Sequence, residues 1–516
     1  MKLVKILSDS VQIRTNTSEF QNIRINDLLE VSDGCARLVV MVTGLTDTDS
    51  EDRLGEDDFL GEITGIKTID CTIIGSLKDG RFVKSLDNYP TTNVQISKIA
   101  LQEFTHMIAP YEEECFQLGH YAAYGELAWV DGNKFFQRHA CIVGNTGCGK
   151  SETVAKILEE AAKLPGANVV VFDVHGEYSA LSYARNIKIG EDFHFPIWMF
   201  GFHDIVVNIL KIREESATAV VTALRKCYYV VCPDGKENKP VYFSYQKLIS
   251  EMEALDQQVV CTGEYYKTGD KAGTAKTTKG EYNGKLTGTI NLLKDRLLDG
   301  RYSFLFHDEQ QCYLYELLKQ LLGDDKAVKN IDLSGIPHDV ALPLIGAITR
   351  MIFDLQRLQD KDQIRPVVLV CDEAHAYIPD NLQLSASQRR MVEVFENIAK
   401  EGRKFGITLF LATQRPSELN RTIVAQCANF IVGKLNNEND KVLIKGMLQD
   451  GDDALINAVT MFSPGEVLVI GDAVPIPLKI KVDLASERPI SRTINFWDVW
   501  REGKSLDITE LVDKYL

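Results

Sequence analysis

The densest group of residues that could do chemistry lies between residues 144 and 151. Gly144, Gly147 and Gly149 precede Lys150 and Ser151, and together they read G-x-x-x-x-G-K-S. Glycines allow several backbone amides to face one anion, a following helix adds its positive end, lysine supplies a fixed cation, and serine can coordinate Mg²⁺. The pattern predicts a phosphate-binding P-loop. The residues expected to contact the nucleotide are Gly144, Asn145, Thr146, Gly147, Cys148, Gly149, Lys150, Ser151 and Glu152.

Two carboxylates follow a second apolar stretch, which runs from Arg365 to Cys371 and predicts a buried strand. Asp372 is expected to bind Mg²⁺ together with Ser151, and Glu373 to act as general base on the attacking water. Because this second half of a nucleotide site follows the P-loop in the expected order, the predicted cofactors are ATP and Mg²⁺.

Polar residues end two further predicted strands. Asp173 ends the apolar stretch 167–173 and Glu177 follows it, while Gln414 ends another apolar stretch. The carboxyl ends of parallel strands face the ligand crevice, so Asp173 and Glu177 are candidates to position water or Mg²⁺. The alternative is that they cap the loop after their strand. Gln414 is expected beside the γ-phosphate, where an amide can sense it and hold water.

Three arginines are candidates to stabilise the charge of a phosphoryl-transfer transition state: Arg138, Arg403 and Arg415. In ring-shaped NTPases a neighbouring subunit often supplies such a cation. The alternative for each is a surface ion pair.

An α/β domain must position these residues. From about Gln117, and again from Asn330, apolar strands alternate with helices, as in a domain with a parallel sheet. The intervening residues 203–329 predict a helical insertion, with helices over 205–231 and 286–298. Its lysine-, glycine- and threonine-rich stretch 267–280 is expected to be mobile, or else to contact phosphates.

The first hundred residues predict an all-β unit, most economically a small barrel, because β-branched runs alternate with turn signals such as Asp33-Gly34. Acidic residues crowd the stretch 47–58, which is either a solvated loop tip or a docking surface for a basic partner. The expected units are an N-terminal β-barrel (1–105), an ATPase core in two parts (106–202 and 330–516) and a helical insertion (203–329).

Composition excludes several classes of protein. A chain of 516 residues is too long for one ordinary core, and its 45% hydrophobic and 25% charged residues are typical of globular proteins. No apolar run is long enough to span a bilayer, and the first residues turn polar too soon for a signal peptide, so a cytoplasmic protein without membrane contact is expected. Eleven scattered cysteines lack metal-ligand spacing and are expected to be reduced.

The motifs together are specific, and the chain resembles the HerA family of hexameric DNA translocases, relatives of FtsK. The motifs that carry this resemblance are Arg138-His139, Asp173-Val-His-Gly-Glu-Tyr178, Asp372-Glu-Ala-His375, Glu401-Gly-Arg-Lys-Phe-Gly406 and Ala412-Thr-Gln-Arg-Pro416. Asp372-Glu-Ala-His375 alone also suggests a superfamily-two helicase, but the other motifs of that class are not evident. Cys148 replaces the usual serine or alanine, which suggests sensitivity to thiol reagents.

The resemblance implies a RecA-like P-loop ATPase core, a β-barrel, a helical insertion and a homo-hexameric ring that moves double-stranded DNA through its pore. Lys150 and Ser151 would then bind phosphate and Mg²⁺, Asp372 and Glu373 would support hydrolysis, and Gln414 would sense the γ-phosphate. Arg138 or Arg403 would reach a nucleotide across a subunit interface. The net charge of −16 is compatible with DNA binding only through a local basic lining.

Partners are also implied by the resemblance. HerA-type motors work with a NurA-like nuclease in DNA repair, or with a sirtuin-type NADase or another nuclease effector in anti-phage systems, docked through the β-barrel. Two other functions stay open: an ATP-binding ring scaffold that regulates an effector without moving DNA, and an ATPase of conjugation or secretion. DNA-stimulated ATP turnover distinguishes the motor from the scaffold.

Overall fold

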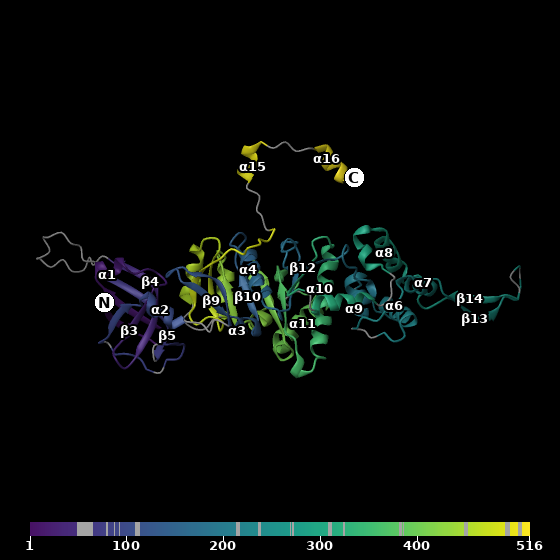
Figure 1. Cartoon of the computed structure of the whole chain (residues 1–516). Coiled ribbons are helices and arrows are strands. Elements are labelled where there is room, and N and C mark those ends of the chain that lie inside the picture. Colours follow the sequence, from purple (N-terminus) through teal and green to yellow (C-terminus); the bar gives the residue numbers. More distant parts are fainter. Residues whose placement is uncertain are drawn as a thin grey trace, which may run out of the picture.

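The computed structural model is elongated, with the N-terminal sheet at one end, a large α/β core in the middle, and a helical segment tipped by a hairpin at the other end (Figure 1). The described residues are 1–48, 66–78, 81–86, 88–91, 93–108, 114–212, 217–235, 239–268, 270, 273–307, 312–323, 326–380, 384, 386–447, 453–490, 496–503 and 508–515.

The N-terminal unit is an antiparallel sheet in the order β1-β2-β5-β4-β3-β7, with β6 beside β5. Bulges in the β4–β5 pairing, one between Val39 and Val40 and one between Val42 and Gly44, mark local departures from a regular ladder. Among the described residues the end strands β1 and β7 approach each other without pairing, so the unit is a half-barrel and the predicted barrel is not confirmed. The strands are β1 Lys2–Ile6, β2 Ser10–Thr15, β3 Leu28–Ser32, β4 Arg37–Thr48, β5 Ile66–Lys78, β6 Arg81–Val83 and β7 Gln95–Lys98.

Of the acidic stretch 47–58, only Asp47 and Thr48 are described. The Asp47 carboxylate lies 3.0 Å from the amino group of Lys67 on the neighbouring strand. The other acidic residues of the stretch, on which the docking hypothesis depends, lie outside the described residues.

The core sheet has eleven strands in the order β12-β15-β11-β16-β17-β10-β18-β19-β20-β8-β9. The run from β12 to β18 is parallel, as predicted, and the strands beyond β18 pair antiparallel. The predicted α/β class is therefore confirmed. The strands are β8 Cys115–Tyr121, β9 Leu127–Asp131, β10 Ala140–Val143, β11 Val169–Asp173, β12 Ala184–Lys188, β15 Val328–Asp332, β16 Val367–Cys371, β17 Ile407–Thr413, β18 Asn429–Val432, β19 Glu466–Gly471 and β20 Leu478–Val482.

The central parallel strands are largely apolar and are covered by helices. Every residue of β10, β11 and β17 is buried. The longest of the helices is α10 (His338–Gln356), and the P-loop helix is α4 (Lys150–Ala162). The other helices of the core and its approaches are α2 Leu101–Ile108, α3 Gly132–Gln137, α11 Ala386–Glu401, α12 Arg421–Val424, α13 Glu438–Met447 and α14 Asp453–Ala458.

The insertion between β12 and β15 is mainly helical, with two differences from the sequence prediction. The stretch 205–231 is divided into a π-helical turn, Ile205–Ile209, and the helix α6, Thr218–Val231. The lysine-rich stretch contributes a strand to a projecting hairpin, β13 (Val259–Tyr265) with β14 (Ala275–Lys279). The other helices are α5 Phe202–Asp204, α7 Tyr245–Asp256, α8 Thr287–Leu298 and α9 Cys312–Leu322.

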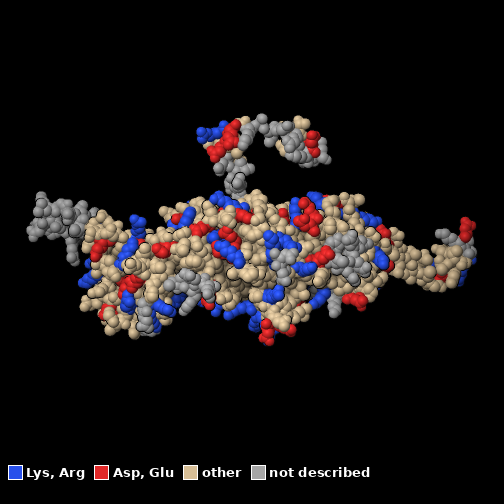
Figure 2. Space-filling view, in the orientation of Figure 1, with Lys and Arg blue, Asp and Glu red and all other residues tan. Residues whose placement is uncertain are grey.

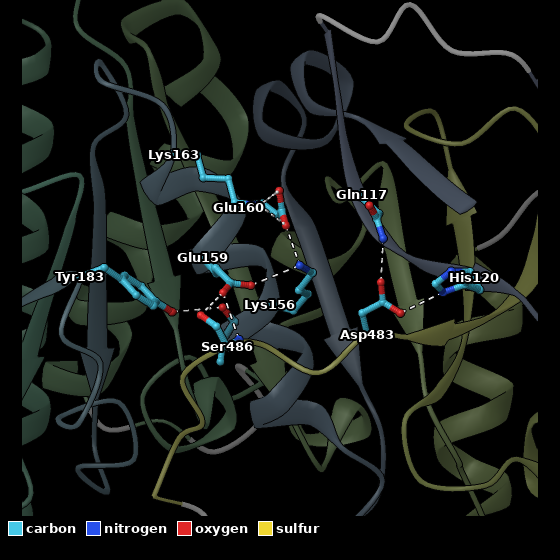
Figure 3. Close-up of polar contacts among 10 residues, drawn as sticks. Gln117, His120, Lys156, Glu159, Glu160, Lys163, Tyr183, Asp483 and Ser486 are labelled. Carbon is cyan, nitrogen blue, oxygen red and sulfur yellow. Dashed lines mark hydrogen bonds and ion pairs between the residues drawn. The ribbon is translucent and has the colours of Figure 1, made fainter. Parts of the chain in front are cut away.

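After β20 the chain runs across α4 as a segment without regular structure, residues 483–490, which we call the strap. Figure 3 shows Ser486 of the strap beside Glu159 of α4, and Asp483 beside Gln117 and His120. The last two helices, α15 (Phe496–Glu502) and α16 (Ile508–Tyr515), stand away from the body (Figure 1). None of the helices in the described part of the chain has both the length and the apolar character needed to cross a bilayer.

Candidate nucleotide-binding site

The predicted site residues gather at one edge of the core sheet. Strand pairing places Val143 of β10 opposite Thr413 of β17, and Cys371 of β16 between Phe172 of β11 and Leu411 of β17. Because parallel strands end at the same edge, the P-loop, Asp173, Asp372 and Gln414 all emerge there.

The P-loop needs its glycines for two different reasons. Gly147 and Gly149 have φ of 76° and 96°, which side chains rarely allow. A Cβ at Gly144 would lie 2.5 Å from the sulfur of Cys148. The loop is held from outside by two backbone hydrogen bonds, from Asn145 N to Lys434 O (2.9 Å) and from Gly465 N to Cys148 O (2.8 Å).

Cys148 is a packing residue. Its side chain is buried between Gly144 and Gly433, and burial raises the pKa of its thiol. Because the thiolate is the reactive form, the structure contradicts the expected sensitivity of the site to thiol reagents.

A chain of polar contacts connects the P-loop to the predicted general base. The Lys150 amino group donates to Glu373 Oε1 at 2.6 Å and lies 3.9 Å from Asp372 Oδ1. The Gln414 amide donates to the same Glu373 oxygen at 2.5 Å and accepts a hydrogen bond from the Thr146 hydroxyl. Four of the predicted residues therefore form one connected group: Thr146, Lys150, Glu373 and Gln414.

The pKa values of the two adjacent carboxyl groups, Asp372 and Glu373, are shifted in opposite directions. Burial raises the pKa of Asp372 to about 7, against the opposing effect of Lys150. Burial also disfavours the ionised form of Glu373, but the nearby Lys150 and Gln414 outweigh it and lower the pKa of this carboxyl. Glu373 is therefore ionised at neutral pH, as a general base must be.

Several buried side-chain oxygens near the P-loop have no hydrogen-bond partner among the described residues. They are Glu152 Oε2, Glu177 Oε2, Tyr178 Oη, Asp372 Oδ1 and Glu373 Oε2. Four of them belong to carboxylates. Unpaired buried carboxylate oxygens are costly unless a cation or water satisfies them. The donor set therefore fits Mg²⁺, which prefers oxygen ligands and retains several water molecules.

Asp173 has the loop-capping contacts that were its alternative role. Its carboxylate accepts hydrogen bonds from the backbone of Glu177 (3.0 Å) and Tyr178 (2.9 Å) and from the Asn330 amide (3.2 Å). Asp173 thus holds the loop that carries Glu177, and its effect on the site is to position that loop.

Arg138 and Arg403 lie at the opposite edge of the sheet. Arg403 precedes β17 and Gln414 follows it, and seven extended residues span roughly 20 Å. Both exposed arginines line a hollow of about 690 Å³ beside Asp472, with which Arg138 pairs. Neither arginine can therefore reach the nucleotide of its own chain. Arg415 lies at the P-loop edge, 3.0 Å from Glu418.

Three further residues contribute to the site and were not assigned from the sequence. Lys434 lines the hollow that contains Asn145 to Cys148 and Gln414. The His375 ring lies 3.2 Å from the Thr413 hydroxyl and 3.3 Å from Glu373 Oε2, so it connects two strand ends. Tyr178 is fully buried beside Ser151 and Asp372. Only the place of Tyr178 and His375 directly after apolar strands could have indicated them.

Comparison with known proteins identifies relatives. The family model described as "Helicase HerA, central domain" matches residues 116–352. The DNA double-strand break repair helicase HerA of Saccharolobus solfataricus is 26% identical over 71% of this chain and 68% of its own. The protein of the same name from Sulfurisphaera tokodaii is 27% identical over 73% and 70%. A probable helicase of Methanocaldococcus jannaschii is 27% identical over 72% and 67%.

Solved structures give weaker likenesses. VirB4 of Thermoanaerobacter pseudethanolicus is 15% identical over 72% of this chain and 97% of that chain, with a TM-score of 0.48. The plasmid coupling protein TrwB in complex with an ATP analogue is 14% identical over 73% and 92%, with a TM-score of 0.45. Because both scores are below 0.5, we draw no conclusion from them. The sequence matches agree with the motifs at the P-loop edge: residues 116–352 match the central domain of the HerA helicase, and the chain is similar to HerA helicases of the FtsK-HerA superfamily.

Proposed function

We propose that this chain is the subunit of a hexameric ring that hydrolyses ATP to move double-stranded DNA. The observation that carries the proposal is the buried group of Lys150, Glu373 and Gln414 at one sheet edge, with candidate arginines about 20 Å away at the other. One edge has the parts of a hydrolytic site, and the other has cations that only a neighbouring subunit's nucleotide could meet.

Hydrolysis requires a rearrangement within this group. Lys150 is bound to Glu373, so the base is engaged by the cation that should hold phosphate. The β- and γ-phosphates of ATP would attract Lys150 and leave Glu373 free to accept a proton from water. Gln414, which contacts both Thr146 and Glu373, is placed to align that water with the γ-phosphate.

Mg²⁺ would be held by Ser151 and Asp372, and it would neutralise charge developing on the phosphate oxygens. Asp372 suits this role because its unpaired Oδ1 is buried at the site. The P-loop residues Gly144 to Gly149 would supply backbone amides, and Glu152 lies in the first turn of α4.

The DNA part of the proposal is supported by the relatives, several of which are named DNA double-strand break repair helicases. The chain has a net charge of −16, and Figure 2 shows basic and acidic side chains interspersed over the visible face. DNA contacts would therefore be confined to the lining of the ring, with phosphates as the main ligands and little sequence preference.

A partner effector is part of the same proposal. The family resemblance supports a NurA-like nuclease in DNA repair, or a sirtuin-type or nuclease effector in anti-phage defence, docked on the N-terminal half-barrel. The names of these relatives favour repair. Co-purification with the product of the neighbouring gene distinguishes the partners.

The test compares Lys150→Ala and Glu373→Gln with the exposed control Glu393→Gln on α11. Lys150→Ala should abolish nucleotide binding, because it removes the phosphate-binding cation. Glu373→Gln should bind ATP and hydrolyse it about 10²–10⁴-fold more slowly, the usual contribution of a general base. Glu393→Gln should match the wild type.

Two readouts test the motor itself. Duplex DNA should stimulate ATP turnover by the wild type and the control, and both should displace a protein roadblock from duplex DNA. Particle images should show six-fold symmetry. ATP turnover that is indifferent to DNA would support the scaffold instead, and undiminished turnover by Glu373→Gln would refute the assignment of the base.

A further inference from the structure

In the described part of the chain, a cluster of buried oxygens without hydrogen-bond partners, which we call the pocket, lies near Ser151. Tyr178 is completely buried, Asp372 is 1% exposed, and Tyr178 Oη, Asp372 Oδ1 and Glu177 Oε2 all lack a hydrogen-bond partner among the described residues. The Tyr178 hydroxyl approaches the Ser151 side chain without completing a hydrogen bond of normal geometry.

The carboxylates of this pocket interact with one another. Asp372 is desolvated, and the charges of Glu177 and Asp173 add to the effect of burial in raising its pKa. Burial raises the pKa of Tyr178 well above its ordinary value, and Asp372 and Glu177 reinforce the shift. Tyr178 therefore keeps its proton and can only act as an uncharged hydrogen-bond donor or acceptor beside two carboxylates.

The loop that carries Glu177 and Tyr178 is held from two directions. From beneath, Asp173 accepts both of their backbone amides. From outside, Ile490 of the strap donates its backbone N–H to the Glu177 carbonyl at 2.7 Å, and Glu487 accepts two hydrogen bonds from Ser182. These contacts hold the backbone that carries Glu177 and Tyr178 on both sides.

We propose that Glu177 shares one hydrated divalent cation with Asp372 at Ser151, accepting hydrogen bonds from water on the ion, and that Tyr178 is a positioning residue for the Ser151 hydroxyl. The proposal rests on the nucleotide site described above and extends it to two residues outside the P-loop and the Asp372-Glu373 pair. Carboxylates that accept from metal-bound water commonly change metal affinity by about 10–100-fold.

The test measures binding of fluorescent ADP by the full chain in EDTA and in Mg²⁺, and binding of Mn²⁺ by paramagnetic resonance in the presence of ADP. Glu177→Gln should bind ADP like the wild type in EDTA. The factor by which Mg²⁺ increases its ADP affinity should be about tenfold smaller than in the wild type, and its affinity for Mn²⁺ should be about tenfold lower. Tyr178→Phe should show the same metal-specific loss to a smaller degree. Glu160→Gln, on the outer face of α4 between Lys156 and Lys163, is the matched control and should behave as wild type.

Each part of the proposal can fail separately. If Glu177→Gln keeps the full Mg²⁺ gain, the inference is overturned while the nucleotide site stands. Equal loss of ADP binding in EDTA and in Mg²⁺ would make Glu177 a direct nucleotide contact or a structural residue, which also overturns it. If the wild type binds ADP without any metal effect, the proposed Mg²⁺ site itself is wrong. Circular dichroism confirms that each variant is folded.

Discussion

At the residue scale, the site depends on buried charges that compensate one another. Lys150 faces two carboxylates in a space that excludes water, and it lowers the pKa of Glu373 while that of Asp372 stays raised. Two neighbours in sequence are thereby prepared for different roles, one as an ionised base and the other as an oxygen ligand that becomes fully charged when a cation arrives.

The buried side chain of His139 should make the stability of the fold depend on pH. His139, just before β10, accepts the backbone N–H of Leu409 at Nδ1 (3.0 Å), so its proton lies on Nε2, 3.0 Å from the Ala399 carbonyl oxygen. Burial lowers the pKa of His139 below its ordinary 6.5. Below about pH 6.5 the unfolded chain therefore binds a proton at His139 that the folded chain does not bind. The free energy of unfolding falls as the pH drops through this range, by up to about 1.4 kcal/mol per pH unit.

Urea unfolding at pH 7.5 and pH 5.5 measures this effect. His139→Asn should be less stable than the wild type at pH 7.5, because two buried hydrogen bonds are altered, but its stability should change less between the two pH values. An equal loss of stability in the two proteins on acidification would show that His139 is not the group responsible.

At the element scale, the strap connects the end of the core sheet to the loop beside the P-loop. Ser486 donates to Glu159 from both its backbone and its hydroxyl, and Glu487 accepts from the backbone and hydroxyl of Ser182 (Figure 3 shows the first pair). These contacts are exposed, so each adds little to global stability. Their effect is local, on the loop that carries Glu177.

Hydrogen exchange tests this division between local and global effects. Glu487→Ala should speed exchange in peptides covering residues 176–184, because the Ser182 amide loses its acceptor and the strap is released. The free energy of unfolding should change by less than about 1 kcal/mol. The control is Glu191→Ala, which removes an exposed carboxylate that pairs with Lys188. It should leave the exchange of residues 176–184 unchanged. Unaltered exchange in Glu487→Ala would mean that the strap does not hold the loop.

The sequence predicted those elements whose signal is local. The apolar stretches 167–173 and 365–371 predict strands, and the structure has strands at Val169–Asp173 and Val367–Cys371. The strap was missed because Ser486 and Glu487 are ordinary polar residues whose partners are far away in the chain. Closure of the N-terminal barrel depends on pairing between its first and last strands, β1 and β7, which no local pattern specifies. The hairpin at 259–279 was missed because glycines and lysines, which are poor strand signals, interrupt its β-branched residues.

At the scale of the whole molecule, the candidate catalytic residues lie at two opposite edges of the core sheet. Carboxylates, Lys150 and the P-loop occupy one edge, while Arg138 and Arg403 occupy the other, around a hollow next to the half-barrel. A ring that stacks one edge against the opposite edge of its neighbour is a head-to-tail assembly that closes on itself. Such an assembly makes each arginine the complement of a nucleotide on another subunit.

Mixing of variants tests whether the arginines act between subunits. Arg403→Ala and Arg138→Ala, each with an intact P-loop edge, are compared in separate assemblies, and the one that supplies the catalytic cation should lose about 10³-fold or more in ATP turnover. Glu373→Gln subunits are inactive themselves but keep both arginines. Rings are then assembled from equal amounts of the inactive arginine variant and Glu373→Gln. An active interface needs an intact Glu373 on one subunit and an intact arginine on its neighbour, and each condition holds for half of the subunits. About one quarter of the interfaces should therefore be active. Turnover should therefore recover toward about one quarter of the wild-type value, although both parent proteins are inactive. An arginine acting within its own chain predicts no recovery at any ratio, and that result would reject the placement of the opposite sheet edge against a neighbour's P-loop.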